Sequence, residues 1–191
     1  MFISGEANAS FMEALQIETE KVPAMLSLDD KNYILWDGSR LKIHGSSLKG
    51  RHLPIVCDKF RDALCEAVFK GDDPLTIFKI FQNLKVFNVH DFQIRVYSTK
   101  GYGDYAKTGL YSNLLKKMAA RGIRVPAGSS LEYVKSTSGY LPVLLFSEDD
   151  AIDYKYYKLR LAEIASRILN KDASALAVLL GCGQVSLEEF A

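Results

Sequence analysis

Two short segments near the start of the chain carry side chains that can bind phosphate groups. Lys31 and Tyr33 are two residues apart, so on a strand their side chains would share one face. After Gly45, just before a predicted helix, the chain offers two hydroxyls and two cations: Ser46, Ser47, Lys49 and Arg51. Hydroxyls and unpaired backbone N–H groups at a helix start attract anions. The pattern indicates a surface for a phosphate backbone, although an ordinary strand edge and a serine N-cap also fit it.

A later segment repeats this combination of a hydroxyl, a flexible residue and cations. Lys107, Thr108 and Gly109 precede a predicted helix whose outward face carries three more cations: Lys116, Lys117 and Arg121. Taken alone, Lys107 to Gly109 also fit an ordinary capped helix. None of these side chains is placed to identify a base. We therefore expect sequence-tolerant and salt-sensitive binding through phosphates.

The charge distribution supports a polyanion partner that the net charge of +1 conceals. Residues 31–124 hold 17 Lys and Arg against 8 Asp and Glu, whereas the rest of the chain holds 7 against 15. A basic segment between acidic ends is a plausible footprint for nucleic acid. A solvated surface with clustered charges is the alternative.

The sequence predicts no catalytic residue and no metal site in this chain. The three cysteines form no C-x-x-C pair, and no histidine lies at a zinc-finger spacing from them. Cys57 and Cys65 are eight residues apart on a predicted helix, so both could face its core. An odd number of thiols indicates a reducing compartment. No apolar run reaches the ~20 residues of a membrane span, so we expect a cytoplasmic protein without a membrane partner.

The apolar pattern predicts an α+β fold. Alternation predicts strands over 31–36 and 40–44 around Asp37-Gly38, a two-residue hairpin signal. Helical spacing predicts helices over about 54–70, 74–84, 111–121 and 153–169. A strand over 92–97 and a second hairpin over 131–135 and 140–145 complete the main elements. Near the start we expect a strand end at 2–3, a helix over 5–15 and a strand over 16–20.

These helices have apolar stripes that should face a core. The stripes include Leu75, Phe78, Phe81, Leu114, Leu115, Met118 and Tyr157.

The order of these features resembles the C-terminal part of family B DNA polymerases. Asp30-Lys31-Asn32-Tyr33 is similar to the K-K-x-Y motif of that family, although Asp30 and Asn32 replace basic residues. Arg51 matches an arginine that begins the first thumb helix. Lys107-Thr108-Gly109 and the segment from Lys116 to Gly122 resemble a thumb segment ending in A-A-R-G. Ile152 to Tyr157 is similar to the start of the last thumb helix.

The resemblance implies a small palm-derived sheet over 1–50, a mainly helical thumb carrying a β-hairpin over 51–170, and a tail over 171–191. It implies duplex primer–template DNA as the partner, bound more weakly because Asp30 and Asn32 replace basic residues. The polymerising carboxylates of the family are absent from this sequence. Mg²⁺ would therefore belong to the assembled polymerase, together with a catalytic polymerase subunit. The chain would be a subunit, a fragment or an inactive relative.

The last residues resemble a sliding-clamp-binding peptide of the Q-x-x-L-x-x-F type. The matching residues are Gln184, Leu187 and Phe190. An accessory module that bridges a partner protein and the clamp remains the main alternative function. A small independent enzyme is a third, without a nucleophile–base pair to support it.

Overall fold

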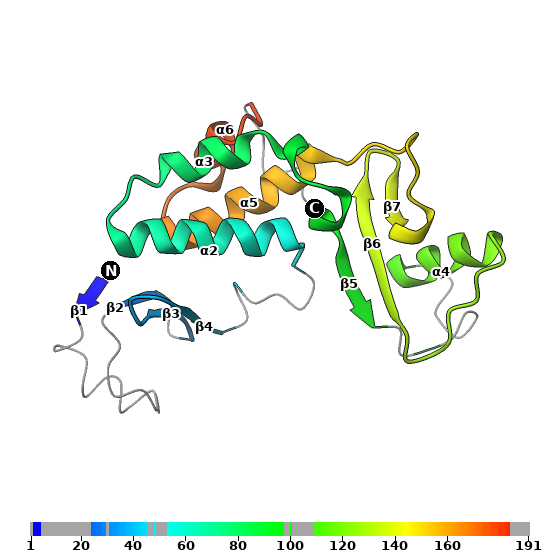
Figure 1. Cartoon of the computed structure of the whole chain (residues 1–191), viewed down its shortest axis with the longest axis horizontal. Helices are drawn as coiled ribbons and strands as arrows, with labels where there is room; N and C mark the ends of the chain where they lie inside the picture. The colour runs from blue at the N-terminus through cyan, green and yellow to red at the C-terminus, as the bar shows by residue number, and fades with distance from the viewer. Residues whose placement is uncertain are drawn as a thin grey trace. The chain divides into compact units, whose positions relative to one another are not determined.

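The computed structural model describes residues 2–4, 24–29, 31–45, 48, 53–97, 100 and 109–183. The fold is α+β, as the sequence predicts. The chain divides into two compact units (Figure 1). The first comprises Met1–Gly50, Lys59–Asn83 and Lys158–Ala191, and the second comprises Arg51–Asp58 and Leu84–Tyr157. The division into palm, thumb and tail is a statement about polymerase regions and stays a prediction.

The first unit contains an antiparallel sheet of four strands in the order β1-β2-β3-β4. These strands are β1 (Phe2–Ser4), β2 (Ala24–Asp29), β3 (Asn32–Trp36) and β4 (Leu41–His44). The predicted hairpin is confirmed: β3 ends at Trp36, as expected, and β4 begins at Leu41, one residue later than expected. The Asp37 carboxylate accepts hydrogen bonds from the N–H groups of Ser39 and Arg40 (2.8 and 2.6 Å) and organises this turn. The helix and strand predicted over 5–20 lie outside the described residues.

Strand β2 is an element that the sequence pattern did not reveal. Its burial does not alternate, because Met25 and Leu26 are both buried. It pairs with β1 on one side and β3 on the other.

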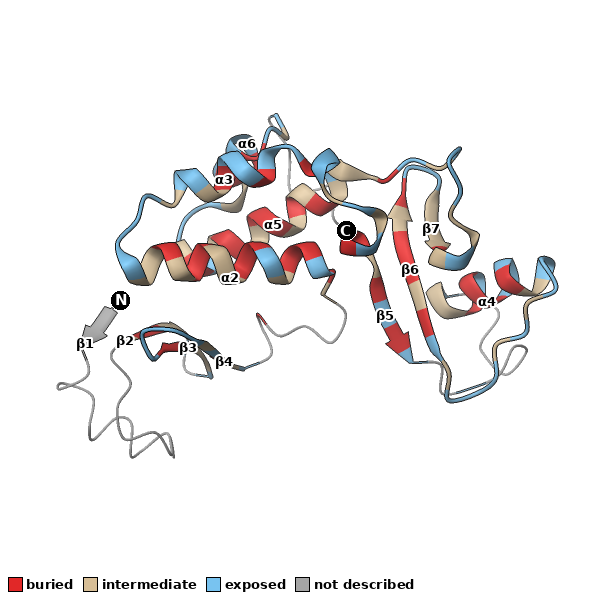
Figure 2. Cartoon of the chain, viewed as in Figure 1, coloured by how far each residue is buried: buried red, intermediate tan, exposed pale blue. Residues whose placement is uncertain are grey.

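Helices build the rest of the first unit, and their buried faces show in red in Figure 2. They are α2 (Ile55–Lys70), α3 (Leu75–Gln82), α5 (Tyr154–Leu169) and α6 (Ala173–Leu179); α2 and α5 each begin in the second unit. The Phe60 ring lies edge-on to Phe78 and Phe81, with centroids 5.6 and 5.1 Å away. The predicted inward position of Leu75 is wrong, because this side chain is 45% exposed.

Helix α6 is a second element that the sequence pattern did not reveal. Asp172 caps it by accepting a hydrogen bond from the N–H of Ala175 (2.8 Å). Its Leu176 and Ala177 are buried, as is Leu180 just after it. The segment from 171 onward is therefore folded at least as far as Leu180.

The two helical cysteines are buried, as their spacing predicts. Burial raises the pKa of the Cys65 thiol to about 12. Cys65 therefore stays neutral at physiological pH and behaves as a small apolar core residue.

The second unit packs a three-stranded antiparallel sheet against helix α4 (Leu110–Ala120). The strands are β5 (Ile94–Tyr97), β6 (Ser130–Ser136) and β7 (Gly139–Pro142), with β6 in the centre. Leu114, Leu115 and Met118 of α4 pack in one cluster with strand residues such as Val96 and Leu131. The predicted second hairpin is confirmed, although β7 gives way to the short 3-10 helix η4 (Val143–Leu145). Two further 3-10 helices, η2 (Leu84–Val86) and η3 (Val89–Phe92), precede β5.

The fully buried Tyr157 connects two elements of the second unit. Its hydroxyl donates to the Phe92 carbonyl of η3 and accepts from the Lys135 N–H of β6, both at 2.8 Å. Burial raises the pKa of this phenol, so it stays protonated and able to donate. Asp153 caps the start of α5 by accepting from the N–H of Tyr156 (3.0 Å). The segment from Asp153 to Tyr157 thus has a structural role.

Candidate nucleic-acid interface

Lys31 lies at the exposed turn between β2 and β3. It precedes β3, so the strand face predicted to carry both Lys31 and Tyr33 carries only Tyr33. The Asp29 carboxylate accepts a hydrogen bond from the Lys31 N–H (2.9 Å). The Tyr33 ring stacks on His44 of β4, with centroids 4.5 Å apart and planes 9° apart. The turn therefore presents a cation beside an oriented phenol.

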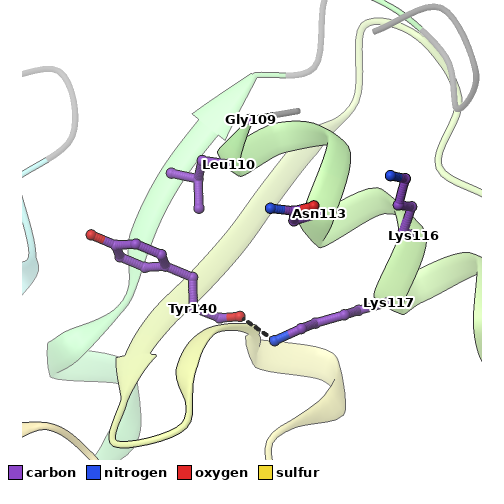
Figure 3. A pocket seen from close by; sticks show the side chains of 6 residues that line it. All are labelled: Gly109, Leu110, Asn113, Lys116, Lys117 and Tyr140. Atoms are coloured by element: carbon purple, nitrogen blue, oxygen red, sulfur yellow. Dashed lines mark hydrogen bonds between the residues drawn. The ribbon is translucent and has the colours of Figure 1, made fainter. Parts of the chain in front are cut away.

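A cleft of about 540 Å³ lies between α4 and β7 in the second unit (Figure 3). Its lining is Gly109, Leu110, Asn113, Lys116, Lys117 and Tyr140. The Lys117 ammonium donates a hydrogen bond to the Tyr140 carbonyl oxygen (2.7 Å). Lys116 extends in a different direction from that bond, as Figure 3 shows. The two neighbouring lysines therefore have different surroundings.

A third lysine, Lys135, adds positive charge near Tyr140. The Lys135 ammonium lies 5.0 Å from the centroid of the Tyr140 ring, a cation–π distance. The rings of Tyr133 and Tyr156 each make an edge-to-face contact with the Tyr140 ring, with centroids 5.6 and 6.4 Å away. Cations around an aromatic core suit an anionic ligand that also has flat or apolar parts, and nucleic acid combines these properties.

The structure places only part of the predicted interface. Lys31, Tyr33, Gly109, Lys116, Lys117 and Arg121 are described, and all except the half-buried Tyr33 are exposed. Ser46, Ser47, Lys49, Arg51, Lys107 and Thr108 lie outside the described residues, as do Gln184, Leu187 and Phe190. Leu48, which lies between Ser47 and Lys49, is buried, and its carbonyl oxygen accepts a hydrogen bond from the Arg61 guanidinium (2.9 Å). This bond anchors the predicted segment to α2 at one point.

Sequence reasoning missed Asn113 and Tyr140 at the cleft, and Lys135 beside the Tyr140 ring. Asn113 could have been found, because it lies three and four residues before Lys116 and Lys117 on one helix face. Tyr140 and Lys135 had no such signal. Tyr140, which bonds to Lys117, lies 23 positions after it in the sequence.

We expect Lys117→Ala and Lys116→Ala to have different consequences. Lys117→Ala removes the bond to Tyr140, so it should lower the free energy of unfolding by about 0.5–1.5 kcal/mol. Lys116→Ala should weaken duplex binding, mainly at low salt. Urea unfolding and fluorescence anisotropy on both variants measure the two effects. An unchanged free energy of unfolding for Lys117→Ala would show that its hydrogen bond to Tyr140 contributes little.

The described residues also bear on metal ions and membranes. Among them, no group of three or more His, Cys, Asp or Glu side chains could hold a metal ion. None of the helices within the described ranges has the length and apolar character needed to cross a membrane.

Comparison with known proteins finds a similar fold but no similar sequence. No protein-family profile matches the chain, and no curated protein matches it by sequence. The family B DNA polymerase from the hyperthermophilic archaeon Pyrobaculum calidifontis is similar in structure, with a TM-score of 0.64 and 17% identity. The fold is similar to that of part of a family B DNA polymerase. The likeness covers 85% of this chain and 24% of that polymerase. The chain thus spans about a quarter of its structural neighbour.

Proposed function

We propose that this chain is the duplex-binding palm and thumb portion of a family B DNA polymerase, either a subunit or a fragment. The observation that carries the proposal is the fold similarity to such a polymerase over 85% of the chain. The order of K-x-Y, A-A-R-G and Tyr-Tyr segments in the sequence supports it independently. The exposed cations at two described places, Lys31 and the α4 cleft, are consistent with a phosphate-binding role.

In this role the chain binds and does not catalyse. Its lysines and arginines neutralise backbone phosphates and hold the primer–template duplex in register. The carboxylates that bind Mg²⁺ for nucleotide transfer belong, in this proposal, to a catalytic part outside the 191 residues. The chain's own contribution is therefore orientation of the duplex and resistance to its dissociation.

We also propose that the C-terminal segment binds a sliding clamp. The spacing of Gln184, Leu187 and Phe190 supports this proposal, since short helical peptides insert such side chains into pockets on their partner. Titration of a clamp with a peptide of residues 184–191, and with its Leu187→Ala and Phe190→Ala forms, tests it.

Salt-dependent binding to duplex DNA is the expected result that tests the main proposal. The whole chain should bind a primer–template duplex with a dissociation constant near 10⁻⁴–10⁻⁶ M at physiological salt, whatever its sequence. Affinity should rise steeply as salt is lowered from 200 to 50 mM, as fluorescence anisotropy would show. The chain alone should not extend a primer. Salt-independent binding, or none at 50 mM together with tight binding to a protein partner, would favour the accessory module.

A further inference from the structure

The turn that carries Lys31 is built around the carboxylate of Asp29. One carboxylate oxygen accepts hydrogen bonds from the N–H groups of Lys31 (2.9 Å) and Asn32 (3.0 Å). The Asn32 side-chain amide donates to both carboxylate oxygens, at 2.7 and 2.8 Å. Two of these four hydrogen bonds hold the backbone at Lys31 and Asn32, and the other two hold the Asn32 side chain on the same carboxylate. They also lower the pKa of Asp29, the Lys31 N–H contributing most, so this carboxylate is ionised at neutral pH.

The other side of the turn is closed by Gly45, at the end of β4. Its φ of +90° is one that side-chain-bearing residues rarely adopt. A Cβ at this position would lie 2.6 Å from both the Lys31 carbonyl oxygen and Asn32 Cγ. The backbone of Gly45 is therefore packed directly against the two residues that the Asp29 carboxylate holds. The Lys31 turn is confined from two sides although it lies at the surface.

Attraction between charges alone would not favour this arrangement at a phosphate-binding site. An anion two residues from Lys31 lowers the local positive potential, and Asn32 adds no charge. A surface built only for attraction to phosphates would avoid Asp29. What the arrangement does provide is a fixed backbone, which reduces the conformational entropy lost when the lysine binds a phosphate.

We infer that Asn32 and Asp29 are positioning residues that hold the Lys31 turn ready for a backbone phosphate. The inference rests on the proposed function and deepens it. Asn32 supports binding through its amide hydrogen bonds to Asp29. The ligand is one phosphate of the duplex, and Lys31 is the residue that touches it.

A double-mutant cycle on the whole chain tests this role. Asn32→Ala leaves the net charge unchanged, so general electrostatics predicts unchanged duplex affinity. Positioning predicts a loss on the order of threefold to tenfold, with a smaller salt slope. In a Lys31→Ala background, the same Asn32→Ala change should have no further effect, because Asn32 acts only through Lys31.

Asp29→Ala separates positioning from charge by the sign of its effect. Removing an anion near DNA should strengthen binding if charge alone matters, whereas loss of the fixed turn should weaken it. Asp37→Ala is the matched control, since Asp37 organises the β3–β4 turn in the same way and its removal changes the net charge equally. We expect weaker duplex binding for Asp29→Ala and equal or stronger binding for Asp37→Ala.

Hydrogen exchange without DNA completes the test. The N–H groups of Lys31 and Asn32 should exchange faster in Asn32→Ala, while the melting temperature and exchange in the α2 core stay unchanged. Absence of salt-dependent binding by the unsubstituted chain would overturn the proposed function and this inference together. Duplex binding that is unaffected by Asn32→Ala, or reduced equally with and without Lys31, would overturn the positioning role alone.

Discussion

Replacing Lys31, Lys49, Arg51 and Lys116 together by alanine is expected to lower duplex affinity more than tenfold at 50 mM salt. Each lysine or arginine that contacts a phosphate releases counterions on binding and contributes about one unit to the slope of log K against log salt. Four lost contacts should therefore reduce this slope by about 3 to 4. The loss should be similar for duplexes of unrelated sequence, because phosphates carry no base information. Anisotropy titrations between 50 and 200 mM salt measure both quantities.

A second quadruple variant controls for net charge. Lys79, Lys85, Lys155 and Lys171 are exposed lysines outside the proposed interface. Replacing all four by alanine changes the net charge of the chain by the same amount. We expect only a modest loss of affinity and a nearly unchanged salt slope. Full affinity in the first variant, or equal losses in both, would contradict a localised phosphate-binding surface.

Tyr157→Phe is expected to lower the free energy of unfolding by about 2–4 kcal/mol. The change removes one oxygen and leaves the Phe92 carbonyl and the Lys135 N–H without the hydroxyl that links them. Each polar group left unsatisfied in the interior costs about 1–3 kcal/mol. Urea unfolding followed by circular dichroism should show the lower midpoint.

Two further measurements make the Tyr157 prediction specific. Tyr154→Phe, on the same turn of α5, keeps the ring contact with Phe92 (centroids 5.6 Å apart) and should change stability little. The single tryptophan, Trp36, belongs to the first unit, whereas Tyr157 belongs to the second. Its fluorescence therefore reports whether the first unit unfolds together with the second. An unchanged midpoint for Tyr157→Phe would show that its two hydrogen bonds contribute little.

Local sequence signals predicted much of this fold correctly. Helical spacing located α2, α4 and α5, and glycines with positive φ follow α2 and α4, at Gly71 and Gly122. The signals failed where burial was not periodic. Strand β2 buries two successive residues, and α6 is only seven residues long. Leu75 lies at helical spacing from Phe78 and is nevertheless exposed, because spacing does not say where a neighbouring element ends.

The sequence by itself determined the α+β class, most of the helices, both hairpins and the cation-rich segments, since these depend on neighbours a few residues apart. Only the tertiary structure decided which cations have which role. Lys116 and Lys117 are adjacent in sequence, yet only Lys117 is shown bonded to the Tyr140 carbonyl, 23 residues away. Likewise, only the structure shows that the Asn32 amide donates to the Asp29 carboxylate. Hydrogen-bond partners depend on how turns and elements fold back on one another, and residue types alone do not specify that geometry.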